Sequence, residues 1–142
     1  MVGDLNWQDY AVQVDVKVDC FGTMAVLIRS KDPSEGIQLQ VSNTSMTWVI
    51  YQEGRAKTIA TANQGLYLYC PMVRVYSGVP PPPSKTYRLK VEARGNIFSA
   101  YLDGTLVSRM QDRTFLSWRV GLGTTSGSDS IRFDTFTVST VR

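Results

Sequence analysis

Apolar side chains at every second position constrain the fold of this chain more than any other feature. Between Tyr10 and Val18, apolar residues alternate with Gln, Asp and Lys, and this period gives a β-strand one dry and one wet face. Helical periodicity is nowhere sustained. The same period or short apolar runs predict further strands at 24–29, 37–41, 46–51, 55–60, 87–93, 97–102, 105–110, 118–123 and 133–138.

Turn signals between these segments support an antiparallel arrangement. Asp103 and Gly104 stand between two apolar runs, where a type I′ hairpin needs positive φ at both central residues. Glu53-Gly54 and Gly95-Asn96 are further hairpin signals. So many strands in 142 residues are best buried as two sheets face to face. We therefore expect an all-β, two-sheet antiparallel jelly-roll sandwich as a single domain over 1–142.

One segment breaks the rhythm of short strands. Residues 61–85 contain Asn, Gln and Gly, several tyrosines and four consecutive prolines. Because proline cannot donate to a strand ladder, this segment is predicted to be an irregular insertion. Cys70 lies in it, and the sequence leaves open whether Cys70 and Cys20 form a disulfide or remain two buried thiols.

Composition excludes several classes of function. The chain has no histidine, which removes the usual general base, the Ser/His and Cys/His nucleophile pairs and imidazole-based zinc sites. Fifteen Lys and Arg stand against twelve Asp and Glu, and the arginines are scattered rather than gathered into a patch for phosphates. No apolar run approaches the roughly 20 residues of a membrane span. We expect neither a nucleic-acid partner nor a membrane span.

Several short motifs follow one another along almost the whole chain. They are Trp-Gln-Asp-Tyr at 7–10, Met-Ala-Val-Leu-Ile-Arg at 24–29, Tyr-Arg-Leu-Lys-Val at 87–91, Tyr-Leu-Asp-Gly at 101–104, Val-Gly-Leu-Gly-Thr at 120–124 and Phe-Asp-Thr-Phe-Thr-Val at 133–138. Their order resembles concanavalin A-like, laminin G-like sandwiches. It is most similar to the lectin-like domain of galactocerebrosidase-type glycoside hydrolases and to related carbohydrate-binding modules.

This resemblance implies a non-catalytic carbohydrate-binding domain that is accessory to a glycoside hydrolase. It implies a fragment or accessory domain of a larger, exported protein with a covalently linked catalytic domain. The expected location is extracellular or secreted, with periplasmic and lysosomal sites as alternatives. A structural or protein-interaction sandwich of laminin G type, without sugar binding, is the alternative function.

An enzyme of this fold would resemble a laminarinase, whose Glu-x-Asp-x-x-Glu motif is absent here. The nearest acidic pair, Asp15 and Asp19, lies roughly 13 Å apart along a strand at about 3.4 Å per residue. Glycosidase carboxylates are about 5–9.5 Å apart. We therefore expect no enzymatic activity, and a glycosidase is the least favoured reading.

Sugar binding requires an exposed aromatic ring beside groups that read hydroxyls. Trp48, Tyr51 and Arg55 flank one predicted hairpin and are candidates, although Trp48 could instead alternate into the interior with Met46 and Ile50. The remaining candidates lie in the insertion, and they are Tyr67, Tyr69, Arg74 and Tyr76.

The resemblance also implies a structural calcium ion, because related domains hold Ca²⁺ through an aspartate of the last strand and carbonyls of the first. Asp134 is the matching position, and Asp4 is its candidate partner near the N-terminus. Oxygen ligands of this kind suit a hard cation. No catalytic role is expected for the ion.

Overall fold

Ten β-strands make up the regular structure of the computed structural model, which describes residues 8–18, 24–32, 34–42, 45–62, 85–115, 119–124 and 131–140. Every strand expected from the sequence is present, with small shifts at the ends. The strands are β1 (Tyr10–Val18), β2 (Met24–Asp32), β3 (Glu35–Val41), β4 (Met46–Gln52), β5 (Arg55–Ala62), β6 (Lys85–Arg94), β7 (Ile97–Leu102), β8 (Thr105–Gln111), β9 (Arg119–Thr124) and β10 (Ile131–Thr140).

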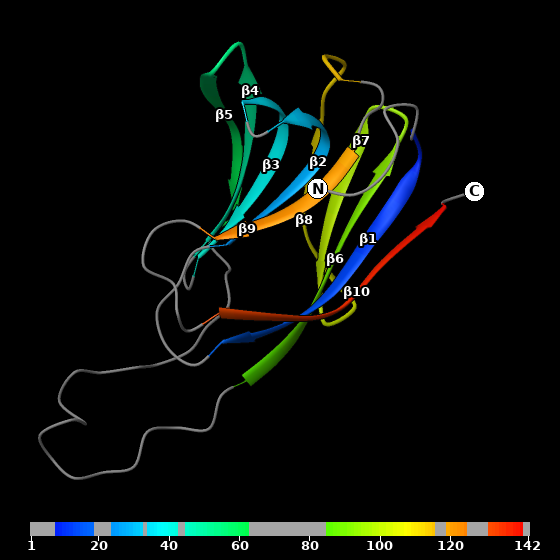
Figure 1. Ribbon diagram of the computed structural model, residues 1–142. Helices are drawn as coiled ribbons and strands as arrows, with labels where there is room; N and C mark the ends of the chain where they lie inside the picture. The colour runs from blue at the N-terminus through cyan, green and yellow to red at the C-terminus, as the bar shows by residue number, and fades with distance from the viewer. Residues whose placement is uncertain are drawn as a thin grey trace, which may run out of the picture.

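The strands form two five-stranded sheets, with the orders β10-β1-β6-β7-β8 and β5-β4-β3-β2-β9. All pairings between neighbouring strands are antiparallel. Figure 1 shows the two sheets stacked as two layers, with the first strand β1 beside the last strand β10. The predicted all-β antiparallel sandwich is therefore confirmed. Among the described residues, no helix is long and apolar enough to cross a membrane.

Two hairpin turns have the backbone that their sequences predict. Asp103 and Gly104 have φ of 51° and 86°, and Glu53 and Gly54 have φ of 53° and 77°. Positive φ at both central residues is the type I′ requirement. These turns join β7 to β8 and β4 to β5 as tight antiparallel pairs.

The core is formed by the alternate residues of both sheets that face each other. In β1 the valines at 12, 14 and 16 are buried, and in the facing sheet Ile37 and Leu39 of β3 are fully buried. Close packing of these side chains supplies most of the favourable free energy of folding in such a domain. The other alternate positions are left on the two outer faces.

Trp48 of β4 lies in this core. It is therefore removed from the residues that could contact a ligand. Its side chain is 0% exposed and packs at a 6.3 Å centroid distance from the ring of Phe98 in the opposite sheet. The indole Nε1 donates to Ser108 Oγ of β8 at 2.9 Å. A fully buried ring cannot stack on a sugar, and the alternative in which Trp48 points inward with Met46 and Ile50 is the one observed.

A buried arginine connects the two sheets at one end. Arg29 of β2 is 1% exposed, and its guanidinium lies 4.8 Å from the centroid of the Phe98 ring. Nε and Nη2 donate to the carbonyl of Gln8 at 3.2 and 2.8 Å, and Nη1 donates to the carbonyl of Phe115 at 3.1 Å. The charge is thus buried with hydrogen-bond partners, as a buried cation requires.

Burial lowers the pKa of the Arg29 guanidinium, and the nearby Tyr10, Asp9 and Asp112 act against that shift. The Asp9 carboxylate lies 3.5 Å from Nη2. Tyr10 is buried too, and its hydroxyl accepts a hydrogen bond of 2.7 Å from the Arg29 backbone N–H. Burial raises the pKa of the Tyr10 hydroxyl, so this group is a neutral hydrogen-bonding partner at physiological pH.

Replacing Arg29 by Met is expected to destabilise the fold by about 1–3 kcal/mol, because removing the donor of the buried Phe115 carbonyl costs about that much. The carbonyls of Gln8 and Phe115 would lose their donors. Urea unfolding followed by circular dichroism measures the change. As a control, the exposed Arg94 replaced by Met should change stability by less than about 0.5 kcal/mol. Equal effects at both positions would contradict the role given to Arg29.

The Trp48–Ser108 hydrogen bond is expected to couple the two sheets by about 1 kcal/mol. A double-mutant cycle with Trp48→Phe and Ser108→Ala measures this term from urea unfolding curves. Each single variant should be less stable than the parent, and the double variant should lose less than their sum. Additive losses would mean that this bond contributes nothing of its own.

Candidate functional site

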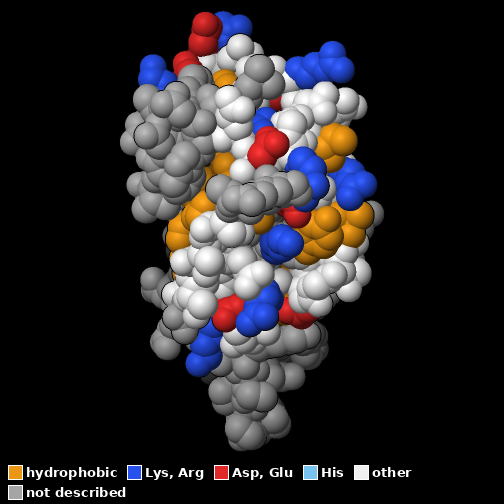
Figure 2. All heavy atoms as spheres, turned by 90° about the vertical axis from the view of Figure 1, so that its right-hand side faces the viewer, with side chains coloured by type: hydrophobic (Ala, Val, Ile, Leu, Met, Phe, Trp, Pro, Cys, Tyr) orange, Lys and Arg blue, Asp and Glu red, His pale blue; other side chains and the backbone are white. Residues whose placement is uncertain are grey.

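A polar groove lies on the outer face of the β10-β1-β6-β7-β8 sheet, and it is called the groove below. Its volume is about 730 Å³. Figure 2 views the molecule from the right-hand side of Figure 1 and shows acidic, basic and hydrophobic side chains close together on that side. The groove is lined by Gln13 and Asp15 of β1, Thr86, Arg88 and Lys90 of β6, Tyr101 of β7, and Asp103 and Gly104 of the following turn.

The strand period places these side chains on one surface. Asp15 lies between the buried Val14 and Val16, and Arg88 lies between the buried Tyr87 and Leu89. Side chains on either side of an inward-facing residue point outward. The register then sets neighbours across the strands, since Asp15 is opposite Arg88, and Gln13, Lys90 and Tyr101 form one row across β1, β6 and β7.

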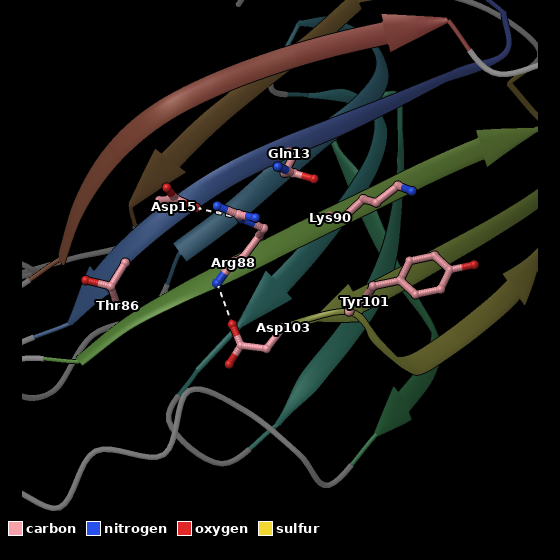
Figure 3. A pocket seen from close by; sticks show the side chains of 8 residues that line it. Gln13, Asp15, Thr86, Arg88, Lys90, Tyr101 and Asp103 are labelled. Atoms are coloured by element: carbon pink, nitrogen blue, oxygen red, sulfur yellow. Dashed lines mark hydrogen bonds and ion pairs between the residues drawn. The ribbon is translucent and has the colours of Figure 1, made fainter.

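At one end of the groove, hydrogen bonds hold Arg88 between two carboxylates (Figure 3). Its Nε lies 3.3 Å from Asp15 Oδ1. Its backbone N–H donates to Asp103 Oδ1 at 2.8 Å, and the Asp103 N–H donates to the Arg88 carbonyl at the same distance. The Arg88 side chain is 60% exposed, so much of its guanidinium remains open to a ligand.

At the other end of the groove, Figure 3 shows Lys90 and Tyr101 side by side. The Lys90 ammonium lies 5.4 Å from the centroid of the Tyr101 ring, within the range of a cation–π contact. It also lies 3.7 Å from Glu92 Oε2. Tyr101 is half-buried, so its ring is fixed in the sheet but still partly open to solvent.

This arrangement can recognise a molecule that has both apolar faces and hydroxyls. The Tyr101 ring offers a flat apolar surface, whereas Arg88 donates hydrogen bonds and Asp15 and Asp103 accept them. The ion pair limits the motion of the Arg88 side chain, so less conformational entropy is lost when a ligand binds.

Two of the sequence-predicted site residues lie elsewhere in the fold and apart from each other. Tyr51 is half-buried on the outer face of the second sheet, where its hydroxyl accepts from Gln40 Nε2 at 3.1 Å. Arg55 is opposite Gln52 across the hairpin, whereas Tyr51 is opposite Ala56. Neighbouring pairs point to opposite faces, so the structure does not bring Tyr51 and Arg55 into one site.

Most remaining candidates fall outside the described residues. These are Tyr67, Tyr69, Arg74 and Tyr76 of the expected insertion, the possible calcium ligand Asp4, and both cysteines, Cys20 and Cys70. Asp134 lies in the last strand opposite Asp15 of the first strand. No group of three or more His, Cys, Asp or Glu side chains suited to a metal ion occurs in the described part of the chain. The calcium site stays a prediction.

Sequence reasoning missed the groove, although part of its signal was visible. Asp15 was expected on a solvated strand face, and it does lie on the outer face of β1. Its partner Arg88 is 73 positions later in the chain. The sequence shows which polar residues point outward from each strand. It does not show which strands are neighbours in the sheet. The pairing of β1 with β6 is the missing piece of information.

No family model and no curated protein matches this chain in sequence. Among solved structures, the carbohydrate-binding module CBM66 of Bacillus subtilis matches with a TM-score of 0.70 and 24% identity, over 94% of this chain and 76% of that one.

Galectins match with similar scores at lower identity. A tetrameric galectin of the sponge Cinachyrella has a TM-score of 0.72 and 10% identity over 100% of this chain and 97% of its own. A galectin of Caenorhabditis elegans has a TM-score of 0.68 and 10% identity, over 98% and 88%. These likenesses establish a galectin-like and CBM66-like fold of the concanavalin A class, as the sequence motifs led us to expect.

Replacing Asp103 by Ala is expected to cost about 1–2 kcal/mol, because a residue other than Gly, Asn or Asp is strained at positive φ. The change also removes the acceptor for the Arg88 N–H. Asp103→Asn keeps an acceptor oxygen and tolerates positive φ, so it should cost less than about 0.5 kcal/mol. Thermal unfolding of both variants measures the difference. Similar melting temperatures for the two variants would contradict this account of the turn.

Proposed function

We propose that this chain is a non-catalytic carbohydrate-binding domain and that the groove is its sugar site. The observation that carries the proposal is that one groove contains both the Tyr101 ring and an Arg88 that is held by Asp15. Sugars present an apolar ring face and hydroxyls that both donate and accept hydrogen bonds. The groove offers a complement to each of these features.

The size of the groove and the elements that line it also suit a sugar ligand. A volume of about 730 Å³ lies within the roughly 300–1,000 Å³ of small-molecule sites. The side chains that line it come from regular strands and one tight turn, which hold binding groups more firmly than long loops. Similarity of fold to proteins described as a carbohydrate-binding module and galectins agrees with the proposal.

The non-catalytic part of the proposal is supported by how the carboxylates are used. Asp15 pairs with the Arg88 side chain, and Asp103 accepts from the Arg88 backbone. Glycoside hydrolysis needs one carboxylic acid that is free to donate a proton and a second carboxylate across the scissile bond. In the groove, both carboxylates already serve to position Arg88.

The proposal extends to the setting of the domain. An exported protein in which this sandwich accompanies a glycoside hydrolase is consistent with the order of its motifs and with its similarity of fold to CBM66. A structural calcium ion near Asp134 belongs to the same proposal, because this residue lies in the last strand beside β1.

A glycan array tests the sugar site, with the parent chain and Tyr101→Ala compared in the presence and absence of a calcium chelator. Loss of the ring is expected to weaken binding about tenfold, since an aromatic contact of about 1.4 kcal/mol corresponds to that factor. The control is Ile97→Ala, because Ile97 is 41% exposed on the same strand and does not line the groove. It should bind as the parent does.

Two results would overturn the proposal in different ways. Unchanged binding in both Tyr101→Ala and Arg88→Ala, with both variants folded by circular dichroism, would move the sugar site away from the groove. A folded parent chain that binds no glycan would instead favour the protein-contact sandwich. Loss of binding with chelator alone would support the calcium ion without locating the sugar.

A further inference from the structure

A second hollow lies at the side of the sandwich, and it is called the inter-sheet cleft below. Its volume is about 550 Å³. One side is the β4–β5 hairpin, and the other is the segment that follows β8. Both β5 and β8 are edge strands of their sheets. The cleft is lined by Ile50, Gln52, Glu53, Arg55, Ala56, Lys57, Ile59, Asp112 and Thr114.

Along the face of β5 that is turned toward the other sheet, the side chains change from apolar to basic. Ala60 is opposite the buried Trp48, whereas Lys57 is opposite Ile50 and Arg55 is opposite Gln52. Paired residues share a face of the sheet, so the basic pair continues the inward face of β5 beyond the core. Two cations therefore replace small apolar residues along that face.

Arg55 and Lys57 are free to meet a ligand. Both are exposed, and within the described part of the chain neither side chain has a hydrogen bond or an ion pair. They stand two residues apart on one face of a strand, roughly 7 Å. In the groove, by contrast, Arg88 and Lys90 both have carboxylate partners.

Within the described part of the chain, neither carboxylate that lines the cleft forms an ion pair with Arg55 or Lys57. Asp112 is 9% exposed and accepts hydrogen bonds from the N–H and hydroxyl of Thr114 and from the Phe115 N–H, at 2.9, 2.8 and 3.3 Å. It also acts electrostatically on Arg29. Glu53 is exposed in the hairpin turn, which follows the last strand pair, Gln52 with Arg55. Asp112 thus stays charged, but it is bonded within its own segment and acts on Arg29, which leaves the exposed Glu53 as the other carboxylate that lines the cleft.

We propose that the inter-sheet cleft is a second binding site, for the sulfate or carboxylate group of an acidic polysaccharide. The Arg55 guanidinium can hold either group with two parallel hydrogen bonds, and Lys57 adds a second charge. Ile50 and the 38% exposed Ile59 offer an apolar surface to sugar ring carbons. This proposal does not depend on the groove.

The shape of the edge favours a polysaccharide over an acidic peptide. An extended peptide would bind by adding a strand to β5. The register of β4 and β5 shifts between Trp48 and Val49, however, which leaves Ile59 as an extra residue in β5. Such a bulge and inward charges are features that block strand addition at a sheet edge. A ligand held by side chains meets no such obstacle.

Short dextran sulfate and carboxymethyl dextran, with unsubstituted dextran of equal length as the reference, test the cleft in calorimetric titrations of the full chain. The double variant Arg55→Gln/Lys57→Gln is expected to bind the charged polymers at least tenfold more weakly than the parent. The matched control Lys17→Gln/Arg109→Gln removes two exposed charges from the other sheet. It should change affinity less than threefold.

The possible results separate this proposal from the one for the groove. Retained binding of neutral glycans by the Arg55/Lys57 variant, together with loss of charged dextrans, supports the cleft and leaves the groove intact. Loss of neutral glycan binding only in Tyr101→Ala concerns the groove alone. Equal weakening in both charge variants, or no binding of charged dextran by the parent, overturns the cleft proposal. So does unchanged binding with new self-association, which would assign Arg55 and Lys57 to edge protection.

Discussion

The arrangement of both sheets depends on the contacts that the buried Arg29 side chain makes between them. This side chain belongs to β2 of one sheet, stacks on Phe98 of the other, and holds the carbonyls of Gln8 and Phe115. The Arg29 backbone is irregular at the same place. Its φ is 46°, and the register of β2 shifts there against both β3 and β9. This irregularity accompanies the contact of Arg29, next to the inward-facing Ile28, with Phe98 of the opposite sheet. The strain of positive φ is offset by contacts that leave its donors satisfied.

Through Tyr10, this contact reaches the groove. The Tyr10 hydroxyl accepts from the Arg29 N–H, which fixes the beginning of β1 against the opposite sheet. Because side chains alternate along a strand, fixing one position of β1 fixes the faces of all others. Gln13 and Asp15 are thereby held outward, in register with Lys90 and Arg88. The backbone of Arg29 thus helps to place the polar groups of the outer face.

The strands and turns were predictable from the sequence because their signals are local. Alternation and the Asp103-Gly104 turn act within a few residues, and the structure confirms both. Trp48 was ambiguous because its face depends on how β4 is paired and stacked, and the Ser108 partner comes from the other sheet. The burial of Arg29 could not be predicted, because an arginine at the end of an apolar strand is usually expected to be exposed. The groove was missed for a related reason, namely that β1 and β6 are neighbours only in three dimensions.

The distribution of charge shows why the net charge of the chain is a poor guide to its ligands. A formal charge of +3 suggests an acidic partner for the protein as a whole. In the groove, however, each cation lies within 4 Å of a carboxylate, as Arg88 does with Asp15 at 3.3 Å and Lys90 with Glu92 at 3.7 Å. An anion there would compete with these partners, whereas a neutral molecule with hydroxyls can bind without breaking them. Among the residues that the structure describes, Arg55 and Lys57 have no ion pair where the inward face of β5 passes beyond the core. The same chain can therefore present a charge-balanced surface on one sheet and an attractive site for anions at the edge of the other.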